Sequence, residues 1–372
     1  MSKKTLRLIL IVEAGVAAAA LIFVLAALWN KPLGPILGLP APATTQEGTS
    51  PNLPEAAPVD SALNQTPTPT PSSLLSQIVA LIKPPSAAGK PLCSGPSVMT
   101  ILVVGSDERA DDYLYGLADS IRIVRIDFAS PKVMVLDIPR DLWVEIPDIS
   151  DHYGITHGKL NQAYFFGNPG MGYYTGPGEG PGLLARTLKL NFGLNVDHYL
   201  AVDMTTFARL IDAMDGIDIY VASKIDLNEN QDGANPDYVF EPGVHHLDGQ
   251  MALKLAMNRY PTIFQRARYQ NIVLKAIQDK LLTPAVLPEL PSLIAQFTGS
   301  VQTDLSPNDI NKLLCIGQAM TKDSINMLAF PEKMFSSGDV YDPYRKVNTF
   351  ILETDFNQIR TYLADFMNGI WP

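Results

Sequence analysis

Charged side chains stand at the ends of three neighbouring apolar runs in the first half of this sequence. Asp107 follows the run Met99–Val104, Asp119 opens the next run, and Arg140 and Asp141 follow a third. If these runs are strands of an open α/β sheet, their ends form the usual ligand-binding edge. Two carboxylates there would hold Mg²⁺, and arginine would donate bidentate hydrogen bonds to phosphoryl oxygens. The residue types therefore point to phosphate chemistry, although a strand-end Asp taken alone more often caps a turn or pairs with an arginine.

A second basic group lies at Arg259, Arg266 and Arg268, where one helical pattern ends and the next begins. A charge cluster on a helix is usually a solvated face. Its functional interest depends on what surrounds it.

Common catalytic and cofactor signatures are missing from the sequence. There is no phosphate-binding loop ending in Gly-Lys-Ser/Thr, no pair of histidines at zinc spacing and no cysteine pair for a metal. The glycine-rich stretch Gly167–Gly172 follows no predicted strand and contains Pro169, so we interpret it as a loop and not as a dinucleotide site.

The elements that would position the charged residues follow from the hydrophobic pattern. After Cys93, short apolar runs alternate with segments of helical period, which is typical of an α/β domain. The predicted strands are Met99–Val104, Ser120–Asp127, Val133–Ile138, His198–Val202, Ile217–Val221 and Met327–Phe330. The predicted helices are Lys159–Phe166, Leu183–Phe192, Thr205–Met214, Asp248–Met257, Phe264–Leu281, Ser306–Met320 and Asp355–Met367. The Gly/Pro-rich stretch 167–182 is predicted to be a loop.

An apolar run, Leu8–Trp29, precedes all of these elements. With about 20 residues at 1.5 Å rise each, it is long enough to cross a hydrocarbon core of about 30 Å. Lys3, Lys4 and Arg7 lie on its N-terminal side, so the positive-inside rule places residues 1–7 in the cytoplasm. The alternative is a cleaved signal peptide, whose apolar region usually has about 7–15 residues. We predict a single-pass cell-membrane protein with an extracytoplasmic main domain.

The rest of the chain divides by composition. Residues 30–92 are rich in Pro, Ala, Ser and Thr and are predicted to be a linker. Residues 93–283 carry the α/β pattern, and we expect residues 284–372 to complete the same domain. The net charge of −10 and the pI near 5.0 argue against a nucleic-acid-binding surface, which needs a basic footprint.

The chain has two cysteines, Cys93 and Cys315, and both lie on the predicted outer side. An oxidising environment there would permit a disulfide that ties the start of the domain to its C-terminal part. Two buried free thiols are the alternative, since the sequence does not give their separation.

Seven short motifs occur in the order seen in the LytR-CpsA-Psr family, and the sequence resembles that family over Met99 to Leu281. The motifs are Val104–Arg109, Asp119-Ser120, Ile138–Asp141, Lys159–Tyr164, Val196–Tyr199, Glu241–Gly243 with Leu247–Leu253, and Arg266–Gln270. No single motif is decisive, but their common order is. The anchor with its outward-facing domain also matches the family.

The resemblance implies a three-layer α/β/α fold around a central mixed sheet, and a Mg²⁺-dependent phosphotransferase of the cell envelope. Such an enzyme takes a glycopolymer from a polyprenyl diphosphate carrier and transfers it, with one phosphate, to a hydroxyl of peptidoglycan. The implied metal ligands are Asp107 and Asp119. The implied catalytic residues are these two together with Arg140 and Asp141, the last of which would orient arginines or assist the attacking hydroxyl. The implied diphosphate-binding residues are Arg122, Arg259, Arg266, Arg268 and Gln270.

The sequence departs from the family at three positions that usually carry arginine. These positions are Leu117, Met257 and Tyr269. It also lacks the carboxylates that the family tends to place in the stretch 261–265. Each missing guanidinium removes a charge-assisted contact of roughly 1.5–3 kcal/mol, which Arg122, Arg125 or Arg268 would have to replace. A binding protein of the same fold that holds the lipid diphosphate without efficient chemistry is therefore an alternative. The acidic composition and outward topology disfavour a transcriptional regulator, a role that old names in the family suggest.

The adjacent histidines His245 and His246 precede Asp248, where the likeness to the family implies a turn leading into a helix with Asp248 as its N-cap. We prefer this interpretation to metal binding, because neighbouring side chains rarely reach one ion together.

Overall fold

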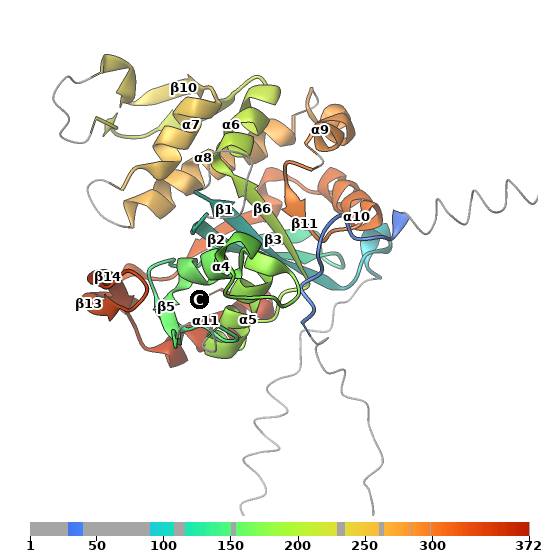
Figure 1. Ribbon diagram of the computed structural model, residues 1–372. Helices are drawn as coiled ribbons and strands as arrows, with labels where there is room; N and C mark the ends of the chain where they lie inside the picture. Colours follow the sequence, from blue (N-terminus) through green and yellow to red (C-terminus); the bar gives the residue numbers. More distant parts are fainter. Residues whose placement is uncertain are drawn as a thin grey trace, which may run out of the picture.

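The computed structural model describes residues 29–39, 90–107, 116–149, 154–228, 235–259, 264–283, 285–297 and 299–371 (Figure 1). The predicted transmembrane helix Leu8–Trp29 lies outside these residues, apart from Trp29. Within the described ranges, no helix combines the length and the apolar character that a membrane span requires.

A six-stranded sheet forms the centre of the molecule. Its strands in spatial order are Gln302–Thr303 (β11), His198–Asp203 (β6), Val98–Ser106 (β1), Ala118–Asp127 (β2), Lys132–Asp137 (β3) and Ile325–Ala329 (β12). The pairs β1–β6 and β3–β12 are parallel, and the pairs β1–β2, β2–β3 and β6–β11 are antiparallel. The predicted central mixed sheet is confirmed.

Alternate residues of β1 enter two different hydrophobic cores, because successive side chains of a strand point to opposite faces. Leu102 and Val104 pack with the helices Leu160–Gly167 (α4), Glu179–Phe192 (α5) and Phe356–Met367 (α11). Met99 and Ile101 face the opposite way and pack with the helix Pro307–Gln318 (α10). Helices therefore cover both faces of the sheet, as the expected three-layer arrangement requires.

A second group of elements has a core of its own and lies above the sheet in Figure 1. It consists of the helices Met204–Ala213 (α6), Gly249–Met257 (α7) and Gln265–Leu281 (α8) and the paired strands Ile217–Val221 (β7) and Gly243–Leu247 (β10). The predicted N-cap is confirmed, since Asp248 Oδ1 accepts a hydrogen bond from the Met251 N–H at 2.8 Å. The residues before it, including both histidines, lie in β10 and do not form the expected turn.

Several elements have no counterpart in the sequence prediction. Besides β10 and β11, they are the strands Trp143–Glu145 (β4), His157–Lys159 (β5), Ile225–Asp226 (β8), Val239–Phe240 (β9), Ser336–Asp342 (β13) and Val347–Glu353 (β14), and the helix Leu290–Gln296 (α9). Helix α5 also begins at Glu179, four residues before its predicted start at Leu183. The hairpin of β13 and β14 matters most for the site, because the Leu352 N–H donates to the Asp141 carbonyl oxygen at 2.9 Å. The hairpin is thus joined directly to the loop that carries Arg140 and Asp141.

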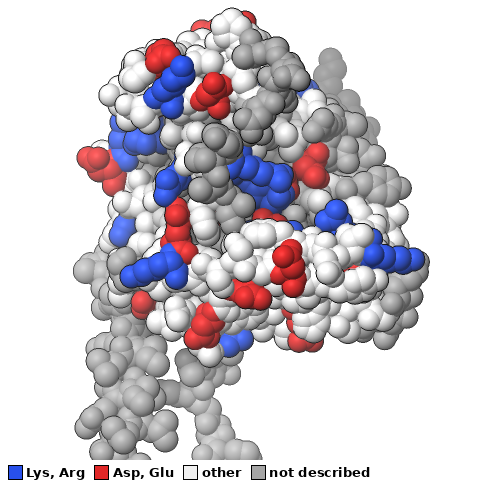
Figure 2. Space-filling model, turned by 90° about the vertical axis from the view of Figure 1, so that its left-hand side faces the viewer, with Lys and Arg blue, Asp and Glu red and all other residues white. Residues whose placement is uncertain are grey.

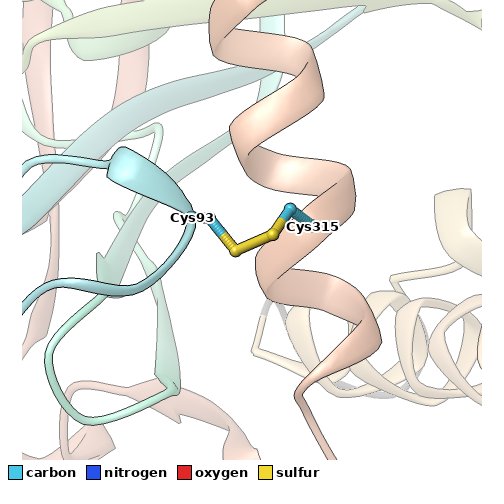
Figure 3. The surroundings of a disulfide bond; sticks show 2 residues. All are labelled: Cys93 and Cys315. Atoms are coloured by element: carbon cyan, nitrogen blue, oxygen red, sulfur yellow. A yellow bond between two sulfur atoms is a disulfide. The ribbon is translucent and has the colours of Figure 1, made fainter.

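Cys93 and Cys315 form a disulfide, which decides between the two alternatives that the sequence left open. Cys93 lies directly before β1, and Cys315 lies in α10 (Figure 3). The bond therefore joins the start of the domain to the helix that covers one face of the sheet.

The first part of the predicted linker is not separate from the domain. Residues 30–39 lie against it, and Leu37 is buried in the larger core. The composition of residues 30–92 did not indicate this contact. Among the residues of this stretch that the structure describes, Leu37 is the only buried apolar side chain.

Candidate active site

The register of β1 and β2 brings two predicted carboxylates to one edge of the sheet. Gly105 pairs with Ser120 and Ser106 pairs with Ala118, so Asp107 and Asp119 both lie at this end of the strands. Asp107 Oδ1 accepts a hydrogen bond from the Leu117 N–H at 2.6 Å, which fixes the carboxylate across the loop.

Asp119 is the point on which the predicted arginines converge. Arg140 Nη1 forms an ion pair with Asp119 Oδ1, and Arg259 Nη2 and Arg266 Nη1 each lie 3.8 Å from Asp119 Oδ2. These arginines come from the loop after β3, the end of α7 and the first turn of α8. Two regions that are far apart in the sequence therefore form one basic cluster.

Burial and mutual repulsion destabilise the charges of this cluster. Burial, together with the nearby Arg266 and Arg259, lowers the pKa of Arg140 to about 10 despite the attraction of Asp141. Burial and Arg259 also lower the pKa of Arg266. Its Nη1 is buried and makes no hydrogen bond within the part of the chain that the structure describes. An unsatisfied buried guanidinium nitrogen beside two other arginines fits an anion that supplies the missing acceptor.

Asp141 lies between two cations, one on each carboxylate oxygen. Arg140 Nε lies 3.3 Å from Oδ2, and Lys159 Nζ lies 3.0 Å from Oδ1. Burial alone would raise the pKa of Asp141, but Arg140 and Lys159 outweigh it and the pKa falls below its usual value. Such a carboxylate is a weak base, so the geometry favours an orienting role over proton abstraction.

Lys159 is a site residue to which the sequence prediction gave no role. It begins one of the seven family motifs, and that position was the only signal that could have found it. Its Nζ also lies 5.7 Å from the centroid of the Phe350 ring in β14. The unpredicted hairpin therefore packs against a residue that contacts the predicted Asp141.

Arg122 lies beneath the arginine cluster and not within it. Its side chain is 3% exposed and lies 3.4 Å from Asp137 Oδ1. Arg122 Nη1 donates to Asn271 Oδ1 at 2.8 Å, and Nη2 donates to Gln270 Oε1 at 3.2 Å. Gln270 and Asp137 both line the cavity. Arg122 therefore contacts two residues of the cavity wall and does not line the cavity itself.

Two other arginines point elsewhere: Arg268, which the resemblance assigns to the diphosphate, and Arg125, which was considered as a replacement. Arg268 forms an exposed ion pair with Glu332 at 2.5 Å and does not join the cluster on Asp119. Arg125 Nε donates to the Met367 carbonyl oxygen at 3.0 Å, at the C-terminal end of α11. Neither guanidinium reaches Asp119.

The three positions without the usual arginine have different surroundings. Leu117 contributes its backbone N–H to Asp107, and Met257 is 38% exposed at the end of α7. Tyr269 is buried in the core of α6, α7 and α8, so its ring stabilises the lobe that carries Arg266. None of these side chains supplies a charge to the cavity.

The cavity beside the cluster has apolar as well as charged walls. Its residues are Asp119, Ile121, Asp137, Ile138, Pro139, Arg140, Asp141, Phe264, Arg266, Ala267, Gln270 and Leu352. Figure 2 shows Lys and Arg side chains gathered in a hollow across the middle of the face that lies at the left of Figure 1. The arrangement can neutralise an anionic group while apolar side chains hold a hydrophobic part beside it.

The residues around Asp107 and Asp119 fit a hard divalent cation only in part. Both offer carboxylate oxygens at the same sheet edge, the ligand type that Mg²⁺ prefers. Among the residues that the structure describes, no group of three or more His, Cys, Asp or Glu side chains is placed to hold a metal. A Mg²⁺ ion here would therefore depend on phosphate oxygens and water for its other ligands.

Comparisons with known proteins give a consistent result. The sequence model of the LytR_cpsA_psr family matches residues 85–360. The regulatory protein MsrR of Staphylococcus aureus (strain COL) is 27% identical over 279 residues, which cover 73% of this chain and 74% of MsrR. The polyisoprenyl-teichoic acid–peptidoglycan teichoic acid transferase TagU of Oceanobacillus iheyensis is 29% identical over 220 residues, which cover 58% of this chain and 62% of TagU.

A solved structure, that of TagV from B. subtilis, has a similar fold. Its TM-score is 0.55 at 23% identity, and the match covers 75% of this chain and all of that one. At this identity the likeness concerns the fold alone.

Proposed function

The chain belongs to the LytR-CpsA-Psr family, and on that premise we propose that it is a membrane-anchored glycopolymer transferase of the cell envelope. Its substrate is a glycopolymer linked to polyprenyl diphosphate, and its acceptor is a hydroxyl of peptidoglycan. The similarity to TagU, a polyisoprenyl-teichoic acid–peptidoglycan teichoic acid transferase, supports this substrate class.

The observation that carries the proposal is the convergence of Arg140, Arg259 and Arg266 on Asp119. Two carboxylates, Asp119 and Asp141, lie among these three guanidinium groups, and burial and the repulsion of Arg266 and Arg259 lower the pKa of Arg140 to about 10. A diphosphate placed here would reduce this repulsion and accept a hydrogen bond from the buried Arg266 Nη1, which makes none within the described part of the chain. The apolar residues Ile121, Phe264 and Leu352 in the same cavity suit the first part of a lipid chain.

The proposed reaction is a phosphoryl transfer. The acceptor oxygen forms a bond to the phosphorus that carries the glycan, and the bond from this phosphorus to the bridging oxygen of the diphosphate breaks. The hydroxyl proton leaves to solvent or a nearby base, and the products are a phosphodiester and polyprenyl phosphate. Negative charge accumulates on the leaving phosphate, where the guanidinium groups stabilise it. Asp141 holds Arg140 and Lys159 in place during this step.

In this proposal Asp107 and Asp119 would be the protein ligands of a Mg²⁺ ion. The ion would supply additional neutralisation of the phosphoryl oxygens. In the described structure Asp119 is paired with arginine, so arriving phosphate oxygens would compete with the carboxylate for these donors.

The test uses the full chain reconstituted in lipid bilayers with a polyprenyl-diphosphate glycan and peptidoglycan. We expect Mg²⁺-dependent release of polyprenyl phosphate from the wild type and its loss in an Asp119→Ala, Arg140→Ala double variant. Equal release by both proteins would overturn the proposal. Tight binding of the lipid by the wild type without any release would identify a binding protein of the same fold, the alternative that the residues Leu117, Met257 and Tyr269 keep open.

A further inference from the structure

The segment Trp29–Leu39 is packed along one edge of the central sheet. The Leu33 N–H donates to the Leu305 carbonyl oxygen at 3.2 Å, and Leu37 is 3% exposed in the larger core. The segment therefore covers the free side of β11, which would otherwise be an exposed sheet edge.

Glycines allow the close approach of this segment. A Cβ atom on Gly34 would lie 2.7 Å from the Thr303 carbonyl oxygen, closer than a side chain tolerates against backbone. Further along, the Gly38 carbonyl oxygen accepts a hydrogen bond from Arg186 Nη2 at 3.4 Å. Contacts at both ends of the segment hold it to the domain.

Three apolar side chains of the same segment are exposed. Trp29 is 49% exposed, Leu33 is 47% exposed and Ile36 is 56% exposed. Lys31 is exposed between them. Tryptophan with a neighbouring lysine at the end of an apolar run is the composition of a membrane–water interface.

The position of α10 connects this segment to the predicted membrane span. Asn308, in the first turn of α10, donates from Nδ2 to Asn30 Oδ1 at 3.0 Å. Asn30 directly follows Leu8–Trp29, the apolar run that is long enough to cross a bilayer. The first turn of α10 therefore contacts the residue that directly follows the predicted span.

We infer that Trp29, Leu33 and Ile36 rest on the outer surface of the bilayer and that the docked segment holds the β11–α10 corner of the domain against the lipid head groups. The inference rests on the membrane anchoring in the proposed function.

The docked segment changes the role expected for residues 30–92, because residues 39 and 90 both belong to stretches that pack on the domain. The stretch 40–89 then connects two parts of the domain and does not separate it from the anchor. The height of the active site above the membrane is set by the fold.

The test places a photo-crosslinking phenylalanine derivative on the domain in the full chain reconstituted in bilayers. Asn311 is the probe position, since it is exposed one turn beyond Asn308. Tyr341 is the control, because it is 57% exposed on the β13–β14 hairpin, which lies on the opposite side of the molecule from α10 in Figure 1. We expect lipid adducts at Asn311 and their absence at Tyr341. Equal adduct yields at the two positions would overturn the inference.

A second variant tests whether packing of the segment Trp29–Leu39 on the domain causes the lipid adducts at Asn311. Gly34→Val should push the segment away from the Thr303 carbonyl oxygen and abolish the adducts at Asn311. Gly317→Ala is the matched control, because a Cβ atom there meets nothing within 4 Å, and it should leave the adducts unchanged. Persistence of the adducts in Gly34→Val would contradict the inference. Extraction of the whole chain from membranes by alkaline carbonate would instead contradict the proposed anchoring.

Discussion

The guanidinium of Arg122 holds the side-chain oxygen of Gln270, with 3.2 Å between Nη2 and Oε1. This hydrogen bond fixes the orientation of the Gln270 amide at the wall of the cavity that the residue lines. A residue on a central strand thus orients a helix residue of the candidate site.

We predict that Arg122→Met weakens substrate binding and destabilises the fold. The substitution leaves Asp137 without its partner, at a cost of about 3–5 kcal/mol in the free energy of unfolding. The double variant Arg122→Met, Asp137→Asn should recover most of this stability but keep a raised KM, because Gln270 still lacks its anchor. Denaturant unfolding and steady-state kinetics measure the two effects. A stable double variant with a normal KM would show that Arg122 has no role in the site.

Lys159→Met should lower kcat/KM by about tenfold, the effect of losing about 1.5 kcal/mol in one charge-assisted contact. Its Nζ holds one oxygen of Asp141 at 3.0 Å, and Asp141 in turn orients Arg140. Lys159→Arg keeps the charge and serves as the control. Rates of polyprenyl phosphate release measure the change, and equal losses in both variants would argue against an electrostatic role.

Binding of a diphosphate diester should weaken as the pH rises through about 10. The pKa of Arg140 is about 10, so this guanidinium is charged below that pH and loses its proton above it. An anion binds the protonated form, so its affinity should be constant at lower pH and fall at higher pH. The ligand keeps the same charge over this range, so calorimetry without Mg²⁺ reports on the protein. The Arg140→Ala variant should bind more weakly and lose most of the fall; an identical fall in that variant would exclude Arg140 as the titrating group.

Replacement of Cys93 and Cys315 by alanine should lower the free energy of unfolding by about 2–5 kcal/mol, because the bond closes a long loop of the unfolded chain. The two residues are 222 positions apart in the sequence. Urea unfolding of the wild type with and without a reductant gives the same comparison. Superimposable curves would show that the bond does not constrain the unfolded state.

The hydrophobic pattern predicted the central strands and the longer helices because their apolar residues follow clear periods. The register of Gly105 with Ser120 then brings Asp107 and Asp119 to one edge, as the positions of the strand ends indicated. The β13–β14 hairpin was missed because most of its residues are at least partly exposed and lack a continuous apolar run. Its turn did carry a signal, since Asp342 Oδ1 accepts from the backbone of Tyr344 and Arg345.

The direction in which each arginine side chain points could not be predicted from the sequence. Arg122 and Arg125 both lie in β2, yet one reaches Gln270 and the other reaches the end of α11. The bulge between Gly105 and Ser106 shifts the register near the site, and no periodicity in the sequence indicates it. Tertiary contacts therefore decide which guanidinium groups meet on Asp119.

The docking of the segment Trp29–Leu39 also constrains the order in which parts of the domain can fold. Leu33 is synthesised near the beginning of the chain, but its partner Leu305 follows most of the domain. Closing so long a stretch of chain costs entropy before the contact contributes any stability, which slows folding. The segment Trp29–Leu39 therefore has no partner in a nascent chain until β11 and Leu305 have been synthesised, and chaperones that bind exposed apolar segments would have their best opportunity during that interval.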